Sequence, residues 1–174
     1  MLTFHKNEKM LEDAARHYYE INPTQLPTGS RIKTLKLSTL YHQSYLEKDM
    51  YVPYTQKYCS IENSWVKVRK ENGEYKYYTY LECGILSSTI DHKGPEIKLE
   101  GSMEETIDVN EEYKDPGIKS IVDNVDGKMK TSDVMVKSDL DTSKVGSYEI
   151  TYTAYDSLNN KSVVTRKINV VRKL

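Results

Sequence analysis

The chain has few of the residues that give a short sequence an immediate chemical signature. Its 174 residues include one Trp, one Phe, two Cys, four His and five Pro. The net charge is -1 at pH 7, so no basic excess favours nucleic-acid binding, which depends on neutralising phosphates. No apolar run approaches the roughly 20 residues that cross a bilayer, and residues 1–10 lack the apolar core of a signal peptide.

Motifs for catalysis are also missing. No HExxH, Gly-x-Ser-x-Gly or phosphate-binding glycine loop is present, and the four histidines are widely spaced: His5, His17, His42 and His92. A nucleophilic Cys59 or Cys83 with His42 as its base is allowed by composition alone. We therefore predict that the chain is not an enzyme, with no catalytic residues, no cofactor and no nucleic-acid partner.

The aromatic residues divide the chain into two parts. Eleven of the fifteen tyrosines, the only Trp and the only Phe lie before residue 81, and both cysteines lie before residue 84. Gly94 and Pro95 interrupt regular structure just before a segment with strand-like alternation. We predict two domains, an α+β domain at 1–94 and an all-β domain at 95–174.

The first domain is predicted to begin with two helices, one long and one short. Phe4, Leu11 and Ala15 belong to an apolar set that recurs at helical spacing, and Asn22-Pro23 should end the first helix. Ser38 is the predicted N-cap of the second helix.

A β-hairpin should follow, because Asn72-Gly73 separates the strand-like segments SWVKVRK and EYKYYTYLEC and favours a two-residue type I′ turn. Pairing through that turn places Val68 opposite Tyr77, Lys67 opposite Tyr78 and Trp65 opposite Tyr80. Packing in the core or between domains is the preferred role of the tyrosine-rich strand. The alternative is that Trp65, Tyr78 and Tyr80 contact a ligand such as a glycan.

Cys59 and Cys83 bracket this hairpin. Without a CxxC pair or a nearby histidine at metal spacing, a disulfide is preferred to a zinc site, and two free buried thiols are the alternative. Strand register places Glu62 rather than Cys59 opposite Cys83. The chain must therefore bend between Cys59 and Glu62 for the sulfurs to meet.

The second domain shows repeated strand-like segments joined by short polar turns, a spacing typical of a β-sandwich. These segments are EIKLEG, TIDVN, GIKSIV, DVMVKS, SYEITYTAYD and KSVVTRKINVV. In SYEITYTAY, alternate residues form two faces, as expected of a strand with one face in solvent. One face has Tyr148, Ile150, Tyr152 and Ala154, and the other has Glu149, Thr151, Thr153 and Tyr155. On the last strand, Arg166 interrupts an otherwise apolar inward face.

Four stretches of the second domain carry a resemblance to a known family: PEIKLEG, EEYKDPGIKSIVDNVDG, LDTSKVGSYEITYTAYDSLNNKS and KINVV. In order and spacing they resemble the bacterial surface immunoglobulin-like domain over residues 95–171. The resemblance implies an immunoglobulin-like β-sandwich outside the cell that acts as a spacer or adhesive module and is rarely a catalyst.

The first domain resembles the ectodomains of pilin-like, membrane-anchored surface proteins of Gram-positive bacteria. The resemblance rests on the helix MLEDAARHYYE, the segment LSTLYHQSYLE and the cysteine-bracketed hairpin. In such proteins an apolar anchoring segment precedes the helix, and this chain lacks one. We expect an ectodomain in which Met1 replaces the natural anchor, so that membrane contact is made only through that missing segment.

The acidic stretch YKDPGIKSIVDNVDG, residues 113–127, has two interpretations, a calcium-binding site or a set of structural turns. The stretch does not match an EF-hand loop, because Val125 occupies the third position counted from Asp123, where a ligand is needed. Lys128 would also repel a bound cation. Turn formation at Asp115-Pro116-Gly117 and Asp126-Gly127 is the preferred role. We predict no metal, and the weak calcium candidates are Asp123, Asn124, Asp126 and Asp156.

These patterns predict a non-catalytic bacterial cell-surface or secreted protein with a pilin-like head and an immunoglobulin-like adhesive or spacer domain. Its expected partners are other cell-envelope proteins, glycans or a host surface. The alternative is an accessory, carbohydrate-binding region of a larger extracellular enzyme.

Overall fold

The computed structural model describes residues 2–47 and 49–172. The chain divides into two compact units, Met1–Asp91 and His92–Leu174. The division thus precedes Gly94, which lies in the second unit. A Cβ on Gly94 would lie 2.5 Å from the carbonyl carbon of Lys161, so glycine here permits a close backbone approach inside that unit.

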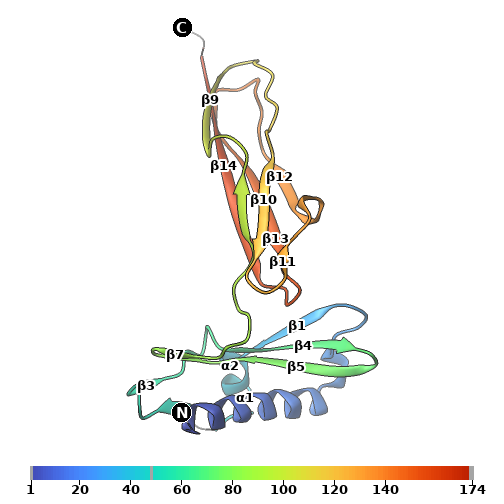
Figure 1. Ribbon diagram of the computed structural model, residues 1–174, viewed down its shortest axis with the longest axis vertical. Coiled ribbons are helices and arrows are strands. Elements are labelled where there is room, and N and C mark those ends of the chain that lie inside the picture. Colours follow the sequence, from blue (N-terminus) through green and yellow to red (C-terminus); the bar gives the residue numbers. More distant parts are fainter. Residues whose placement is uncertain (1, 48, 173–174) are drawn as a thin grey trace. The chain divides into compact units, whose positions relative to one another are not determined.

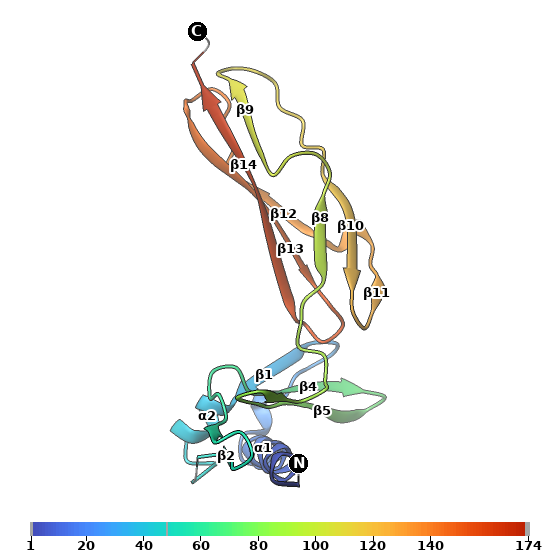
Figure 2. The ribbon, with the colours of Figure 1, turned by 60° about the vertical axis from the view of Figure 1, so that its left-hand side comes forward.

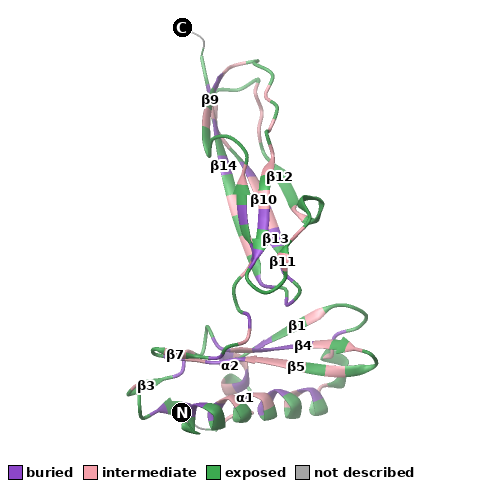
Figure 3. Cartoon of the chain, in the orientation of Figure 1, coloured by how far each residue is buried: buried purple, intermediate pink, exposed green. Residues whose placement is uncertain are grey.

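The first unit begins with helix α1, Leu2–Ile21, which packs against a three-stranded sheet (Figure 1). Its buried side chains recur at helical spacing and are Phe4, Asn7, Leu11, Ala14, Ala15 and Tyr19, and Figure 3 shows this recurrence. The helix ends directly before Asn22-Pro23, as predicted, because the residue before a proline is driven out of the helical region. The 3₁₀ helix η1, Pro23–Gln25, follows it.

The sheet has the strand order β1-β4-β5 and is antiparallel, with β1 at Ile32–Lys36, β4 at Trp65–Glu71 and β5 at Glu74–Tyr80. The hairpin register is the predicted one, with Val68 opposite Tyr77 and Trp65 opposite Tyr80. Strand β1 was not predicted. It pairs with β4, where fully buried Val66 lies opposite Leu35.

The turn between β4 and β5 requires glycine at its second position. Asn72 has φ of 50° and Gly73 has φ of 89°, as a type I′ turn requires. A Cβ on Gly73 would meet no atom within 4 Å, so only the backbone conformation disfavours an alanine there.

Gly73→Ala is expected to lower the free energy of unfolding by about 1 kcal/mol in urea denaturation, whereas Asn72→Gly should change it little. Equal stability of the Gly73→Ala variant and the unaltered chain would contradict this assignment.

The second helix, α2, spans Leu37–His42, and the prediction that Ser38 is its N-cap was wrong. Lys36 occupies the N-cap, while Ser38 lies buried in the first turn. The amide of Leu37 donates to the Ser64 carbonyl and that of Ser38 to the Ile61 carbonyl, each at 3.0 Å. Backbone of the loop before β4 thus satisfies these first-turn amides, so no side-chain cap is needed.

Two short antiparallel pairs complete the first unit: β2 (Tyr51–Val52) with β3 (Lys57–Tyr58), and β6 (Glu82–Cys83) with β7 (Leu86–Ser87). One core cluster joins α1, α2 and the sheet, and it includes Leu11, Leu40, Val66, Leu81 and Cys83. The disulfide-forming Cys83 is thus part of the hydrophobic core.

The second unit contains two sheets, which Figure 2 shows side by side. The first has the order β11-β10-β8, with β8 at Glu96–Leu99, β10 at Ile118–Asp123 and β11 at Gly127–Lys128. The second has the order β12-β13-β14-β9, with β9 at Glu104–Asp108, β12 at Met135–Ser138, β13 at Gly146–Tyr155 and β14 at Lys161–Val171. A 3₁₀ helix, η2, spans Thr131–Asp133.

The two sheets pack through alternating residues. Ile97 and Ile121 of one sheet form a buried cluster with Ala154 of the other. Along β13, Ile150 and Tyr152 are buried while Glu149 and Tyr155 are exposed, as the alternation predicted. Strand β9 runs parallel to β14, and the other pairings in these sheets are antiparallel.

The predicted order, a long helix followed by β structure in several sheets, is therefore confirmed. The finer assignment of the second unit as an immunoglobulin-like sandwich stays a prediction.

Candidate functional site

The acidic stretch singled out in the sequence lies in loops at one end of the second unit. Asp123 ends β10, and its Oδ1 accepts hydrogen bonds from the amides of Val125 and Asp126, each at 2.8 Å. These bonds form an Asx-turn, which shapes the loop 123–127. Asp123 thus has a structural role, but one that uses only one of its two carboxylate oxygens.

The neighbouring loop follows β13. Asp156 Oδ1 accepts from the amides of Leu158 at 2.9 Å and Asn160 at 2.7 Å, and Oδ2 accepts from Asn160 Nδ2 at 2.7 Å. The loop 156–160 is therefore organised around a second carboxylate that is nearly removed from solvent, since Asp156 is 8% exposed.

Asp126 joins the two loops. Its carboxylate accepts from the Ser157 amide at 2.7 Å and from Ser157 Oγ at 2.8 Å, one bond to each oxygen. The structure therefore gives Asp126 a cross-loop role. It fixes the spacing between loop 123–127 and loop 156–160.

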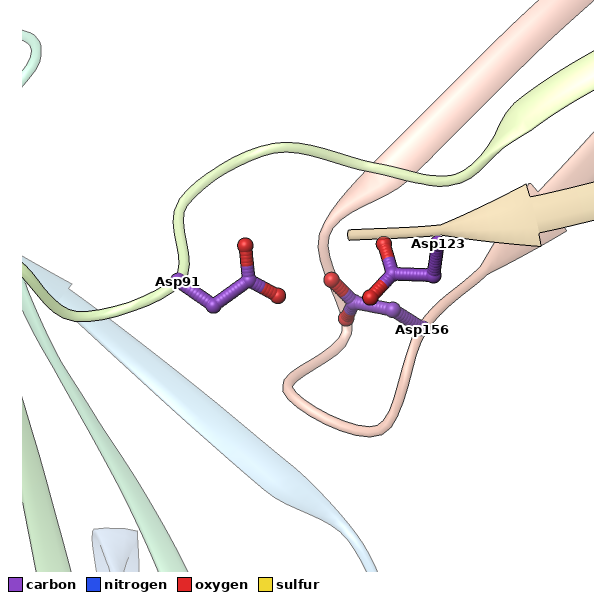
Figure 4. A group of neighbouring side chains, drawn as sticks. All are labelled: Asp91, Asp123 and Asp156. Carbon is purple, nitrogen blue, oxygen red and sulfur yellow. The ribbon is translucent and has the colours of Figure 1, made fainter. Parts of the chain in front are cut away.

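Two of the four calcium candidates face each other. Figure 4 shows the carboxylates of Asp123 and Asp156 side by side; Asp91, also labelled there, ends the first unit. Their ligand oxygens lie within 4.8 Å of one another. Asp123 is 3% exposed, and its buried Oδ2 has no hydrogen-bond partner. Asn124 is exposed and, with Asp123 and Lys93, borders a shallow surface hollow.

The same stretch supplies a partner for the most deeply buried charge of the second unit. Arg166 is fully buried, and its Nε lies 3.2 Å from Asp115 Oδ1 while Nη1 lies 3.2 Å from Glu105 Oε1. Asp115 Oδ2 also accepts from the Tyr152 hydroxyl at 2.6 Å. The guanidinium donates to three backbone carbonyls, those of Glu100, Ser102 and Gly117.

Sequence reasoning assigned Asp115 only to a turn and did not connect it with Arg166. A signal for the pair was nevertheless present, because a charge on an inward strand face needs a partner of opposite charge. The predicted turn at Asp115-Pro116-Gly117 is not observed: residues 111–117 are irregular and run directly into β10, although Gly117 has a φ of 82° that glycine adopts readily.

A buried tyrosine in the first unit, Tyr19, and a half-buried one in the second, Tyr113, are expected to make both units sensitive to alkali. The pKa of Tyr19 is raised to about 12, and so is the pKa of Tyr113, compared with about 10 in an unfolded chain. The main cause in both cases is the loss of solvent around the hydroxyl group. The unfolded state therefore loses these protons first, so the stability they contribute is complete below pH 10 and is lost as the pH rises from 10 to 12.

We expect tyrosinate absorbance to rise in two stages between pH 9 and 12.5, the second coinciding with loss of far-ultraviolet circular dichroism. A single titration near pH 10 with the fold intact would contradict this prediction.

The predicted disulfide between Cys59 and Cys83 is confirmed. The bend that it requires is also present, because the Ser60 amide donates to the Glu82 carbonyl at 2.7 Å and the Ser64 amide to the Ser60 carbonyl at 3.0 Å. These bonds turn the chain immediately after Cys59 and bring it beside the end of the hairpin.

The predicted ligand-contacting aromatics lie on β4 and β5. The Trp65 and Tyr80 rings are 5.4 Å apart between centroids, and Lys67 Nζ lies 4.5 Å from the Trp65 ring centroid. The Tyr78 hydroxyl donates to Glu71. Trp65 and Tyr78 are half-buried, whereas Tyr80 is 5% exposed. A ligand role for these rings stays a prediction.

Comparison with known protein families gives a match in the second unit, over the segment that contains its strands and acidic loops. Residues 97–170 match the family described as bacterial surface protein, Ig-like domain. The resemblance inferred from the sequence is thus confirmed for this segment, called the Ig-like domain below. No curated protein matches the chain.

A solved structure with some similarity is the lipoprotein BT2262 from Bacteroides thetaiotaomicron. It is 22% identical, with a TM-score of 0.41, over 46% of this chain and 39% of that one. This chain therefore spans about two fifths of the length of that lipoprotein.

The family match suggests a cell-surface location. Among the described residues, no helix combines the length and apolarity needed to cross a membrane.

Proposed function

We propose that the chain is a non-catalytic part of a bacterial cell-surface protein in which the Ig-like domain acts as a spacer or adhesive module. The observation that carries this proposal is the family match at residues 97–170. The compact packing of the second unit supports it, because a module with its own hydrophobic clusters can hold other segments apart.

Protease treatment of intact cells tests the location. A tagged copy of the full-length protein in its source bacterium should be cleaved by added trypsin before lysis, while a cytoplasmic marker stays intact. Protection of the tagged protein until the cells are lysed would contradict a surface location.

A pilin-like first unit is a finer part of the proposal. It is supported by the long helix α1 against the β1-β4-β5 sheet and by the disulfide-linked end of the hairpin. The Gram-positive origin rests on that resemblance alone. Incorporation of the tagged protein into surface fibres, seen by immunogold labelling, is the expected result, and its confinement to dispersed single copies would contradict it.

The alternative, an accessory region of a larger extracellular enzyme, differs in what adjoins the chain in its natural gene. A catalytic domain beside this segment would favour the alternative, whereas a membrane anchor and little else favours the surface protein. In either case the segment itself should show no hydrolase activity.

If the aromatic residues of β4 and β5 bind glycans, glycans would be the ligand through which the protein adheres. On a glycan array, Trp65→Ala should abolish any signal, while Tyr54→Ala should retain it because Tyr54 is an exposed aromatic outside this sheet. An equal loss of signal in both variants, or the same signal in both, would contradict a specific site at Trp65.

A further inference from the structure

We propose that the Ig-like domain binds a calcium ion between loop 123–127 and loop 156–160, with Asp123 and Asp156 as its carboxylate ligands. The two loops are the turns after β10 and β13, and Figure 4 shows the two carboxylates that would hold the ion. The inference does not depend on the proposed function. A location outside the cell would mean only that the surrounding medium supplies calcium at millimolar concentration.

The first observation is the unpartnered oxygen of Asp123. Oδ1 is held by the Val125 and Asp126 amides, whereas Oδ2 is buried and receives no hydrogen bond. Burying an ionised carboxylate oxygen is unfavourable unless a donor or a cation compensates for the lost hydration. Because a carboxylate oxygen of Asp123 lies within 4.8 Å of a carboxylate oxygen of Asp156, a cation that partners Oδ2 would lie beside both carboxylates.

The second observation is that these carboxylates are held in place before any ion binds. Amides of Leu158 and Asn160 fix Asp156, and Asp126 ties the two loops together through Ser157. Two like charges at this separation repel each other in a poorly solvated site. A bound cation would convert this repulsion into two attractive interactions without rearranging the loops.

The donor chemistry favours calcium over other ions. The candidate ligands are hard oxygens, with no histidine or thiol, which disfavours zinc and other soft metals. Calcium accepts six to eight oxygens in irregular geometry and completes its shell with water and carbonyl groups, whereas magnesium demands near-octahedral order. The EF-hand template fails at Val125, but a site built from two separate loops has no need of that spacing.

The test is a calcium titration of the full chain labelled with nitrogen-15 and freed of metal with EDTA. We expect saturable NMR shifts centred on the amides of residues 124–127 and 157–160, with a Kd of about 0.1–1 mM, typical of extracellular calcium modules. Calcium at 10 mM should also raise the Tm of the Ig-like domain by roughly 5–10 °C. Magnesium should bind at least tenfold more weakly.

Asp123→Asn is the decisive variant, because the amide oxygen can keep the Val125 and Asp126 hydrogen bonds while the negative charge is lost. It should weaken calcium binding at least tenfold, yet match or exceed the unaltered chain in Tm when EDTA is present. Asp141→Asn is the matched control, since it removes a half-exposed carboxylate from the loop before β13, at the other end of that strand. It should leave calcium binding unchanged.

Three results would overturn the site: no saturable shift up to 20 mM calcium, shifts centred elsewhere in the chain, or equal binding by Asp123→Asn. Equal affinity for magnesium would overturn the assignment to calcium. The titration of the unaltered chain maps the ion by itself, so the proposal remains testable even if the variant fails to fold.

Discussion

Replacing Arg166 with Met is expected to lower the free energy of unfolding of the Ig-like domain by about 3–5 kcal/mol. Methionine fills much of the same volume, but it leaves Asp115 and Glu105 without their cation and three backbone carbonyls without a donor. A loss of this size is a large fraction of the roughly 5–15 kcal/mol that holds a typical domain together.

Urea denaturation followed through NMR signals of β13 and β14 measures this effect. Lys167→Met is the matched control, because Lys167 is the exposed neighbour of Arg166 on β14 and pairs with Glu104 at the surface. It should cost less than about 1 kcal/mol. Arg166→Lys should fall between the two, since a single ammonium cannot reach every acceptor of the guanidinium fork. Equal stability of the Arg166→Met and Lys167→Met variants would show that the buried network contributes little.

Loss of the Cys59–Cys83 disulfide should destabilise the first unit by about 3.5 kcal/mol, on the chain-entropy account of a loop of this length. The bond closes a sequence separation of 24 residues that contains the whole β4–β5 hairpin. Both sulfurs belong to the core cluster, so Cys59→Ala with Cys83→Ala also removes some buried contact.

Trp65 is the only tryptophan and lies on β4, so its fluorescence reports on the first unit during urea denaturation. The midpoint of that transition should fall in the double alanine variant. It should also fall in the unaltered chain after reduction, while Asp141→Asn should not change it. A midpoint that is unaffected by both treatments would mean that the hairpin is held by packing alone.

Local signals were sufficient for the elements whose residues interact mainly with their sequence neighbours. The end of α1 follows from Asn22-Pro23, and the β4–β5 register follows from Asn72-Gly73, because each depends on backbone preferences at one or two positions. Strand β1 and the cap of α2 were missed because distant segments decide them. Strand β1 forms by pairing with β4, and the amides at the start of α2 bind carbonyls near residues 61–64.

The candidate calcium site shows the same division. Sequence spacing identified Asp123 and Asp156 as candidate ligands, but it could not assign separate roles to the neighbouring acids. Asp126 bonds to Ser157 across the loops and Asp115 binds Arg166, interactions between residues 31 and 51 positions apart in the chain. Only the three-dimensional structure shows which carboxylate oxygen is left without a partner.

The parallel pairing of β9 with β14 also determines how the Ig-like domain responds to mechanical tension. Five residue pairs join the two strands, from Glu104 with Lys167 to Asp108 with Val171. A pull on the chain before β9 and on the end of β14 acts in opposite directions along parallel strands, so it loads all these hydrogen bonds in shear at once. These hydrogen bonds must then break together, whereas a pull across the strands would open them one pair at a time.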